Sequence, residues 1–170
     1  AQKATSFLEP RDIIILDSST TVSMMVPYLA RELDLTIICY NYHILSQLPK
    51  DENSNMIFTG GIYNHHMQMF ESTEGINIIK EHRAKKCFFS TSGIHERLGM
   101  TCSYPYEVLT KRASLSSSAM RILLTDSSKF GVVTTSYFAK LTDCDVIITD
   151  DGISEEWIKT IESLGVELHI

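Results

Sequence analysis

The sequence predicts an α/β fold with a doubly wound, mainly parallel sheet. Short aliphatic runs alternate along the chain with segments of helical pattern, as in repeated strand–helix units. The first run, four aliphatic residues at 13–16, has the composition of a strand that is buried on both faces of such a sheet. With 170 residues, 44% of them hydrophobic and 21% charged, the chain has the size and composition of a single globular domain spanning residues 1–170.

Seven segments have the pattern of a strand, and helical segments fill the gaps between them. Strands are expected at 13–16, 35–40, 56–58, 87–90, 122–125, 145–149 and 166–170. Helices are expected at 19–33, 74–85, 107–119 and 154–164, after an opening segment, 1–9, that has the pattern of a helix end. Pro27 is expected to kink the first long helix, because proline removes a backbone hydrogen bond. The segments 61–72 and 93–105 are predicted to be irregular.

The turn after the first strand has the chemistry of an anion site. Asp17, Ser18, Ser19, Thr20 and Thr21 separate that strand from the next helix. The first turn of a helix has backbone N–H groups without intrahelical partners, and hydroxyl groups add further donors. One serine there would be explained as a helix N-cap, but four successive hydroxyl side chains exceed what a cap requires. The turn is therefore predicted to bind a phosphate-type anion.

Every predicted strand ends in small, polar or glycine residues. In open α/β sheets ligands bind outside the carboxyl ends of the strands, so these residues are expected to share one cleft. The fifth strand is followed by Asp126, Ser128 and Lys129. A lysine at that edge would meet the same anion, and a turn with a solvated lysine is the structural alternative.

Two further features have structural explanations that stay open. Gly60 and Gly61 follow the third strand, where they allow either a tight turn or close approach of the backbone to a ligand, and Gly93 is similar. Glu107 and Lys111 lie at positions i and i+4 near a helix start, for which an ordinary surface pair is the simpler explanation.

Charge and composition exclude several classes of function. With a net charge of −6 and no basic stripe, the chain alone should bind DNA poorly. No apolar run approaches the roughly 20 residues that span a bilayer, and the start has no signal-peptide pattern. The four cysteines lack metal-site spacing, and the adjacent His65 and His66 do not suit one zinc site. No metal, cofactor, disulfide framework or membrane partner is therefore expected, and a cytoplasmic location fits.

The chain resembles the C-terminal effector-sensing domain of DeoR-family bacterial transcriptional regulators over nearly its whole length. The motifs that carry the resemblance are Leu16-Asp17-Ser18-Ser19-Thr20-Thr21, Gly60-Gly61, Gly75, Ser92-Gly93-Ile94, Gly99-Met100-Thr101, Glu107 with Lys111-Arg112, Asp126-Ser127-Ser128-Lys129-Phe130-Gly131 and Ile147-Ile148-Thr149-Asp150. The resemblance implies the fold of ribose-5-phosphate isomerase, glucosamine-6-phosphate deaminase and CoA transferases. It also implies an N-terminal winged helix-turn-helix that binds operator DNA. That domain is absent from this chain, which is expected to be a fragment because it lacks an initiator Met.

The resemblance implies a phosphorylated sugar as effector and a site with two ends. At the phosphate end, Ser19, Thr20 and Thr21 would hold the phosphate with their hydroxyls and backbone amides, and Lys129 would add charge. The residues implied at the sugar end are Asp17, Asn41, Gly60, Gly61, Thr101, Glu107 and Lys111. The predicted effector site is completed by Ser18, Gly93, Asp126 and Ser128, and no residue is assigned a catalytic role.

The leading hypothesis is the effector-sensing domain of a regulator of sugar metabolism. It is expected to be a repressor, to form a homodimer or homotetramer, and to couple effector binding to DNA binding by the absent domain. The alternative is a sugar-phosphate isomerase or deaminase on the same fold, in which Glu107 or Asp126 would be the carboxylate base.

Overall fold

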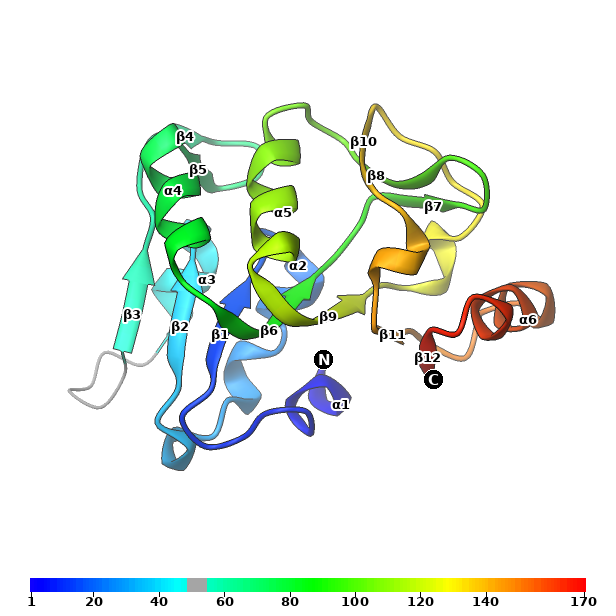
Figure 1. The fold of residues 1–170 in the computed structure, drawn as a ribbon, viewed down its shortest axis with the longest axis horizontal. Helices are drawn as coiled ribbons and strands as arrows, with labels where there is room; N and C mark the ends of the chain where they lie inside the picture. The colour runs from blue at the N-terminus through cyan, green and yellow to red at the C-terminus, as the bar shows by residue number, and fades with distance from the viewer. Residues whose placement is uncertain (49–54) are drawn as a thin grey trace.

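A seven-stranded sheet forms the centre of the molecule in the computed structural model, which describes residues 1–48 and 55–170 (Figure 1). From edge to edge its strands are β12 (Glu167–His169), β11 (Val146–Ile148), β9 (Ser118–Leu124), β6 (Ala84–Phe89), β1 (Ile13–Leu16), β2 (Thr36–Cys39) and β3 (Asn55–Phe58). Every neighbouring pair is parallel. The predicted α/β fold with a mainly parallel sheet is confirmed.

The chain enters the sheet in its middle and winds outward in both directions. β1 lies beside β6, with β2 and β3 on one side of this pair and β9, β11 and β12 on the other. In a doubly wound sheet, a crevice forms outside the carboxyl ends of the two strands where the winding direction reverses. In this sheet those strands are β1 and β6, so a ligand site is expected beyond Leu16 and Phe89.

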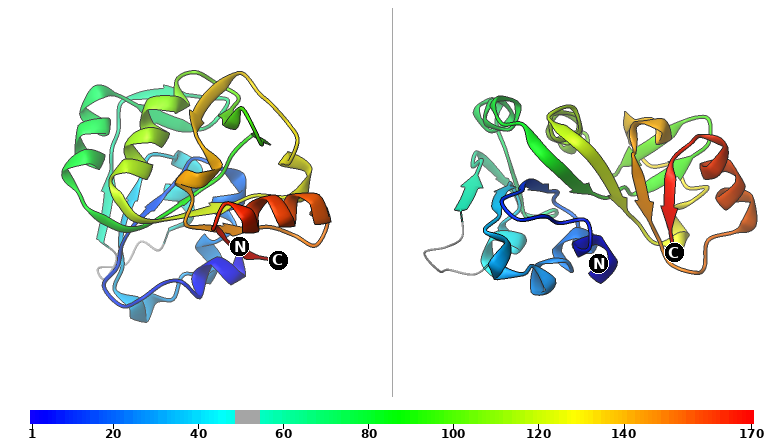
Figure 2. Two further views of the ribbon diagram at one scale, coloured as in Figure 1. Left: turned by 45° about the vertical axis from the view of Figure 1, so that its right-hand side comes forward. Right: turned by 60° about the horizontal axis from the view of Figure 1, so that its bottom comes forward.

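Helices cover both faces of the sheet (Figure 2). The first face is covered by α1 (Gln2–Thr5), α2 (Thr20–Ser23) and α3 (Tyr42–Gln47), and the second by α4 (Thr73–Glu81), α5 (Glu107–Ser116) and α6 (Glu155–Ser163). Side chains alternate along β1, because Ile14 and Leu16 pack in the first layer and Ile15 packs in the second. The uninterrupted aliphatic run of this strand is therefore explained by two cores rather than one.

The predicted helix at 19–33 is wrong. The structure has the short helix α2 followed by two 3₁₀ helices, Val26–Tyr28 and Arg31–Leu33. Pro27 stands at the start of the first 3₁₀ helix, and the extended backbone of Leu29 (ψ 116°) separates the two. Proline thus ends the helix rather than kinking it. None of the helices within residues 1–48 and 55–170 is long and apolar enough to cross a membrane.

The predicted helices at 74–85 and 107–119 are too long, because β6 begins at Ala84 and β9 at Ser118. The start of β6 is concealed in the sequence by its lysines. Lys86 is buried in the sheet, where its Nζ lies 2.5 Å from Oδ2 of the fully buried Asp12. A charged strand residue that is neutralised by a distant aspartate gives no local strand signal.

The segments predicted to be irregular contain antiparallel strands. One segment forms the hairpin of β4 (Ile62–Asn64) and β5 (Met69–Glu71). The other supplies β7 (Gly93–His95) and β8 (Gly99–Cys102), which join β10 (Ser136–Ala139) in a small three-stranded sheet. These strands have only three or four residues of mixed polarity, so their partners rather than their own pattern define them.

Candidate functional site

Polar residues from several strand ends meet at the crevice beyond β1 and β6, where the structure has a cavity of about 540 Å³. Its lining comprises Ser18, Ser19, Thr20, Thr21, Asn41, His43, His65, His66, Met67, Gln68, Ser90, Thr91, Ser92, Ser103, Glu107, Lys111, Asp126, Lys129 and Thr134. The cavity therefore lies at the position where doubly wound sheets bind ligands.

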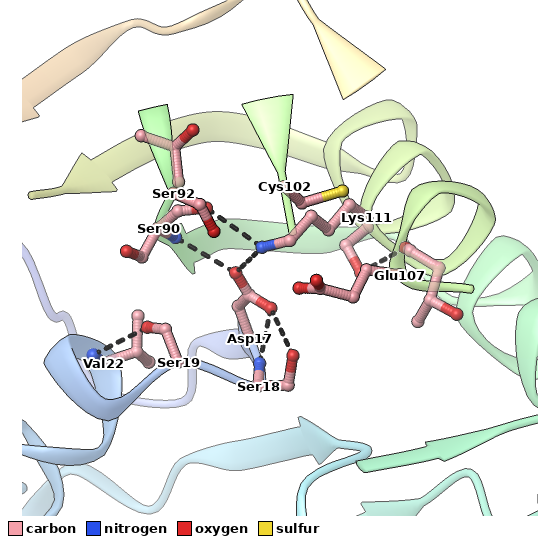
Figure 3. A network of polar contacts seen from close by, with 12 residues as sticks. Asp17, Ser18, Ser19, Val22, Ser90, Ser92, Cys102, Glu107 and Lys111 are labelled. Carbon is pink, nitrogen blue, oxygen red and sulfur yellow. Dashed lines mark hydrogen bonds and ion pairs between the residues drawn. The ribbon is translucent and has the colours of Figure 1, made fainter. Parts of the chain in front are cut away.

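An ion pair between Asp17 and Lys111 forms the floor beneath this cavity (Figure 3). The Lys111 Nζ lies 2.5 Å from Oδ2 of Asp17 and donates to the Ser90 carbonyl oxygen at 2.9 Å. The same carboxylate accepts hydrogen bonds from the Ser90 amide at 3.0 Å and from the Tyr40 hydroxyl at 3.0 Å. Because Asp17 directly follows β1 and Ser90 directly follows β6, this network ties together the ends of the two strands at the crevice.

Burial and charge act in opposite directions on this pair. Burial alone would raise the pKa of the Asp17 carboxyl, but Lys111 and the hydrogen bonds from Ser90 and Tyr40 hold that pKa below its usual value. Burial alone would lower the pKa of the Lys111 ammonium, but the Asp17 and Glu107 carboxylates raise it. Both groups are therefore charged at neutral pH, and each neutralises the other.

Glu107 lies one helical turn before Lys111 at the start of α5, with its side chain beside the cavity (Figure 3). The surface-pair explanation for these residues is wrong, because Glu107 is 2% exposed and Lys111 is 4% exposed. Glu107 accepts a hydrogen bond from the Tyr104 amide at 3.0 Å. Burial raises the pKa of its carboxyl, and the nearby Lys111 charge offsets only part of that effect. The site thus contains a buried carboxyl that protonates more readily than an exposed one.

Hydroxyl groups and backbone amides form one wall of the cavity. The Ser19 hydroxyl accepts from the Val22 amide at 3.0 Å, so it caps α2, and the Ser18 hydroxyl donates to Asp17 at 3.2 Å. Thr20 and Thr21 stand in the first turn of α2, where the helix offers their N–H groups no acceptor. Ser19 is therefore the N-cap, and Thr20 and Thr21 provide donors in excess of what capping requires.

Asn41 connects three parts of the site. Its Oδ1 accepts from the Ile44 amide at 3.0 Å and so caps α3, whereas its Nδ2 donates to the Met67 carbonyl at 2.8 Å. The same Nδ2 lies 3.5 Å from the Ser18 carbonyl oxygen. Asn41 is 4% exposed, and its amide fastens the β4–β5 hairpin and the turn after β1 to α3.

The turn after β9 faces the hydroxyl wall from the other side of the crevice. Asp126 accepts from the Ser128 amide at 3.1 Å and caps the 3₁₀ helix Ser127–Lys129. The Lys129 Nζ lies 3.9 Å from a carboxylate oxygen of Asp126, and its side chain is 40% exposed. Lys129 is thus a partly solvated cation with a weak partner, which leaves it able to bind an anion.

The structure brings nine of the predicted effector residues together around the cavity and leaves six outside its lining. The lining includes Ser18, Ser19, Thr20, Thr21, Asn41, Glu107, Lys111, Asp126 and Lys129. The residues outside the lining are Asp17, Gly60, Gly61, Gly93, Thr101 and Ser128. Asp17 supports the lining from below, and Ser128 bonds to Asp126.

The glycines and Thr101 have structural roles. Gly61, at φ +119°, would place a Cβ on the carbonyl group of Glu71, so it permits the turn between β3 and β4. Gly93 leaves room for the Val132 carbonyl. Thr101 is buried, and its hydroxyl accepts from the Thr134 amide at 2.9 Å.

Sequence reasoning missed ten lining residues: His43, Ser103 and Thr134, and seven more that fall in two groups. Ser90, Thr91 and Ser92 follow β6, and their position after a predicted strand was a usable signal. The second group is the turn of the β4–β5 hairpin, which includes His65 and His66. The pairing of β4 with β5 brings this turn to the cavity, and no local sequence pattern predicts that pairing.

Metal and thiol chemistry find no obvious place in the described parts of the chain. Among residues 1–48 and 55–170, no cluster of three or more histidine, cysteine, aspartate or glutamate side chains is arranged to hold a metal ion. The four cysteines are free and buried, and burial raises the pKa of Cys39 to about 12.

The domain has the mainly parallel α/β fold that is also found in ribose 5-phosphate isomerase. Ribose 5-phosphate isomerase A of Methanocaldococcus jannaschii superimposes with a TM-score of 0.50 and 11% identity, over 76% of this chain and 51% of that one. The family description DeoR C terminal sensor domain matches residues 1–151. The chain therefore belongs to the DeoR family of transcriptional regulators, whose members are regulators and not enzymes.

Relatives with known names agree with this assignment. The HTH-type transcriptional regulator YulB of Bacillus subtilis is 31% identical over 99% of this chain and 65% of its own length. GolR of Listeria innocua is 28% identical over 100% of this chain and 67% of its own. The deoxyribose operon repressor of Escherichia coli is 23% identical over 99% of this chain and 67% of its own length. The chain thus spans about two thirds of the length of these regulators.

Proposed function

We propose that this domain senses a phosphorylated sugar and controls a repressor of sugar metabolism in the bacterial cytoplasm. The observation that carries the proposal is the cavity at the switch point, where a wall of hydroxyls and amides faces a lysine across the crevice. The deoxyribose operon repressor among its relatives supports a sugar-related role and repression. Operator DNA would be bound by a helix-turn-helix domain outside this chain, in keeping with the names of the relatives and with the net charge of −6.

The phosphate would lie against the turn after β1. The Thr20 and Thr21 hydroxyls and amides would donate to its oxygens, together with the free donor of Ser19. Lys129 would approach from the turn after β9 and exchange its 3.9 Å contact with Asp126 for a contact with the phosphate. Lys111 would contribute less, because Asp17 already neutralises it.

The sugar would extend toward Glu107 and the serines after β6. Glu107, Ser92 and Ser103 present oxygen atoms to the cavity, as is needed to bind several sugar hydroxyls. A carboxyl with a raised pKa either accepts or donates a hydrogen bond, depending on its protonation. Asn41 would act indirectly, because its side-chain amide is used by the protein itself.

Binding would become regulation through a difference in affinity between two arrangements of a homodimer or homotetramer. A ligand that binds both arrangements equally shifts no equilibrium, however tight its binding. The cavity joins turns from both halves of the doubly wound sheet, so an occupant that fits one relative position of these halves favours that arrangement.

A panel of sugar phosphates tests the proposal. Ribose 5-phosphate, fructose 6-phosphate and glucosamine 6-phosphate are each added to the chain at 1 mM (about the level of a common metabolite), and the melting temperature and sugar composition are followed. At least one is expected to raise the melting temperature, its unphosphorylated sugar is not, and no sugar is converted. A folded chain that none of them stabilises, or turnover at enzyme-like rates, would contradict the proposal.

A further inference from the structure

Three histidines line the cavity without a role in the proposed phosphate or sugar contacts. His43 comes from α3, and His65 and His66 come from the turn between β4 and β5. They belong to the part of the lining that sequence motifs did not indicate.

The protein holds this histidine turn firmly. Asn41 donates to the Met67 carbonyl at 2.8 Å, and the Tyr42 amide donates to the Gln68 carbonyl at 2.7 Å. The rings are also supported: His66 stacks on Tyr104 with centroids 6.0 Å apart, and His65 meets the Tyr63 ring edge-on at 4.8 Å. All three histidines are exposed residues, and these contacts orient the turn and the rings of His65 and His66 at the rim of the cavity.

The carboxylates around the cavity give these histidines a specific role, which is to offset the repulsion of an acidic ligand group. Among the described lining residues, Lys111 is neutralised by Asp17, and Lys129 lies near Asp126. Glu107 at the sugar end and Asp126 beside Lys129 would each repel a second negatively charged group in the cavity. Histidine is the side chain that gains a positive charge within the physiological pH range, so the histidine wall is able to offset this repulsion.

We propose that His43, His65 and His66 form a second anion subsite. It would bind a second acidic group of the sugar phosphate, either a carboxylate or a second phosphate. This inference rests on the proposed function and narrows the effector to a doubly acidic sugar derivative. A cavity of about 540 Å³ is large enough for a ligand of that size.

Charged groups from several elements surround the subsite. Glu107 and Lys111 face the histidines from α5, Asp126 and Lys129 from the turn after β9, and the phenol of Tyr104 contacts His66. A gain in affinity from a second acidic group therefore has to exceed the repulsion by the Glu107 and Asp126 carboxylates.

Two open-chain probes that differ at one carbon measure this gain. Glucitol 6-phosphate ends in an alcohol and 6-phosphogluconate in a carboxylate, which is ionised at pH 6. Calorimetric titration of the chain at pH 6 should give an affinity at least about 10-fold higher for 6-phosphogluconate, as charge-assisted hydrogen bonds would provide. Both probes carry the same phosphate group, so its contribution cancels in the ratio of their affinities.

Variants assign the gain to the histidines. His65→Asn combined with His66→Asn should reduce the affinity ratio at pH 6 to less than about 3-fold, since asparagine keeps a donor but gains no charge. His169→Asn, on the far edge strand β12, is the matched control and should keep the ratio of the parent chain. If the double variant does not fold, the single variants His65→Asn and His66→Asn are compared with the parent chain instead.

A second pair of probes, fructose 1,6-bisphosphate and fructose 6-phosphate, shows whether the subsite accepts a phosphate as its acidic group. A gain for the carboxylate, the bisphosphate or both supports the subsite and defines what it accepts. If the singly phosphorylated probes bind but no second acid adds affinity, or the ratio survives in the double variant, the inference is overturned and the proposed function stands. If no phosphorylated probe binds at all, both fail.

Discussion

Asp17 and Lys111 are buried charges that the fold requires as a pair. Their contact at 2.5 Å joins the end of β1 to α5, and both side chains are at most 5% exposed. Removal of one partner from a buried pair leaves an uncompensated charge in a poorly polarisable environment. The pair is therefore important both for stability and for the position of the cavity floor.

Lys111→Met should destabilise the chain by about 3–5 kcal/mol, because it leaves the Asp17 carboxylate buried without its counter-ion. Urea unfolding at neutral pH measures the loss. Lys129→Met is the matched control: its ion pair is exposed and long, so the cost should stay below about 1 kcal/mol. Equal effects of the two substitutions would contradict this account of the floor.

Glu107→Gln should change stability in a pH-dependent way. A carboxyl with a raised folded-state pKa contributes stability that is present below its ordinary pKa and is lost as pH rises through the raised value. Glutamine does not titrate, so the free energy of unfolding of the variant relative to the parent should increase between about pH 4 and pH 8. Unfolding at several pH values checks this, with the exposed Glu156→Gln as control. A relative stability that falls with pH would refute the assignment.

At the residue scale, the sequence predicted which side chains form the site better than it predicted what each of them contacts. Ser18, Thr20, Thr21 and Lys129 line the cavity because they follow strands, which the aliphatic runs locate. The local sequence could not reveal that Asp17 points into the core, since its partner Lys111 lies 94 positions away.

At the scale of elements, Asn41 determines how the β4–β5 hairpin meets the sheet. One side chain caps α3 and binds the hairpin turn, so the histidine-bearing wall is fixed to the end of β2. The sequence placed Asn41 after a strand, but its second partner, the Met67 carbonyl, depends on a hairpin that no pattern predicted.

Asn41→Ala should loosen the hairpin as well as the helix cap. The loss of the cap and of the buried hydrogen bond should cost about 1–3 kcal/mol, and amide hydrogen exchange within 65–70 should accelerate. Exchange measured by mass spectrometry tests this. Ser154→Ala removes only the cap of α6 and should leave exchange at 65–70 unchanged. Unaltered exchange in the Asn41 variant would mean that other contacts hold the hairpin.

Element boundaries were predicted well where the pattern is aliphatic and poorly where it is not. Ile13–Leu16 was predicted without error, because four aliphatic residues leave no alternative. Lys85 is the last residue of the predicted helix at 74–85, although β6 already begins at Ala84, because the buried ion pair of the neighbouring Lys86 replaces the apolar contact expected of a strand.

At the scale of the whole molecule, charge separates sensing from DNA binding. A net charge of −6 gives long-range repulsion from nucleic acid, and the cations that line the cavity lie close to carboxylates. The doubly wound topology in turn brings turns from both halves of the sheet to one crevice. The alternation of strands and helices predicted this topology, whereas the contacts between distant turns required the structure.

The chain alone should not bind duplex DNA. At 0.15 M salt, fluorescence anisotropy of a labelled duplex should remain flat up to about 100 µM protein, because the net charge of −6 opposes binding to DNA phosphates. Addition of a sugar phosphate should not change this result. Saturable binding below that concentration would place a DNA contact on this domain and contradict the division of roles.

The central claim is that the turns after β1 and β9 hold the phosphate of a sugar. Its most direct test is calorimetric titration of the most stabilising sugar phosphate into the parent chain and into the double variant Thr20→Val, Lys129→Ala. Both side chains are exposed or partly exposed, so stability should change by less than about 1 kcal/mol. Affinity should fall about 100-fold, as expected for the loss of a hydroxyl donor and a cation. An unchanged affinity in the folded variant would contradict the claim.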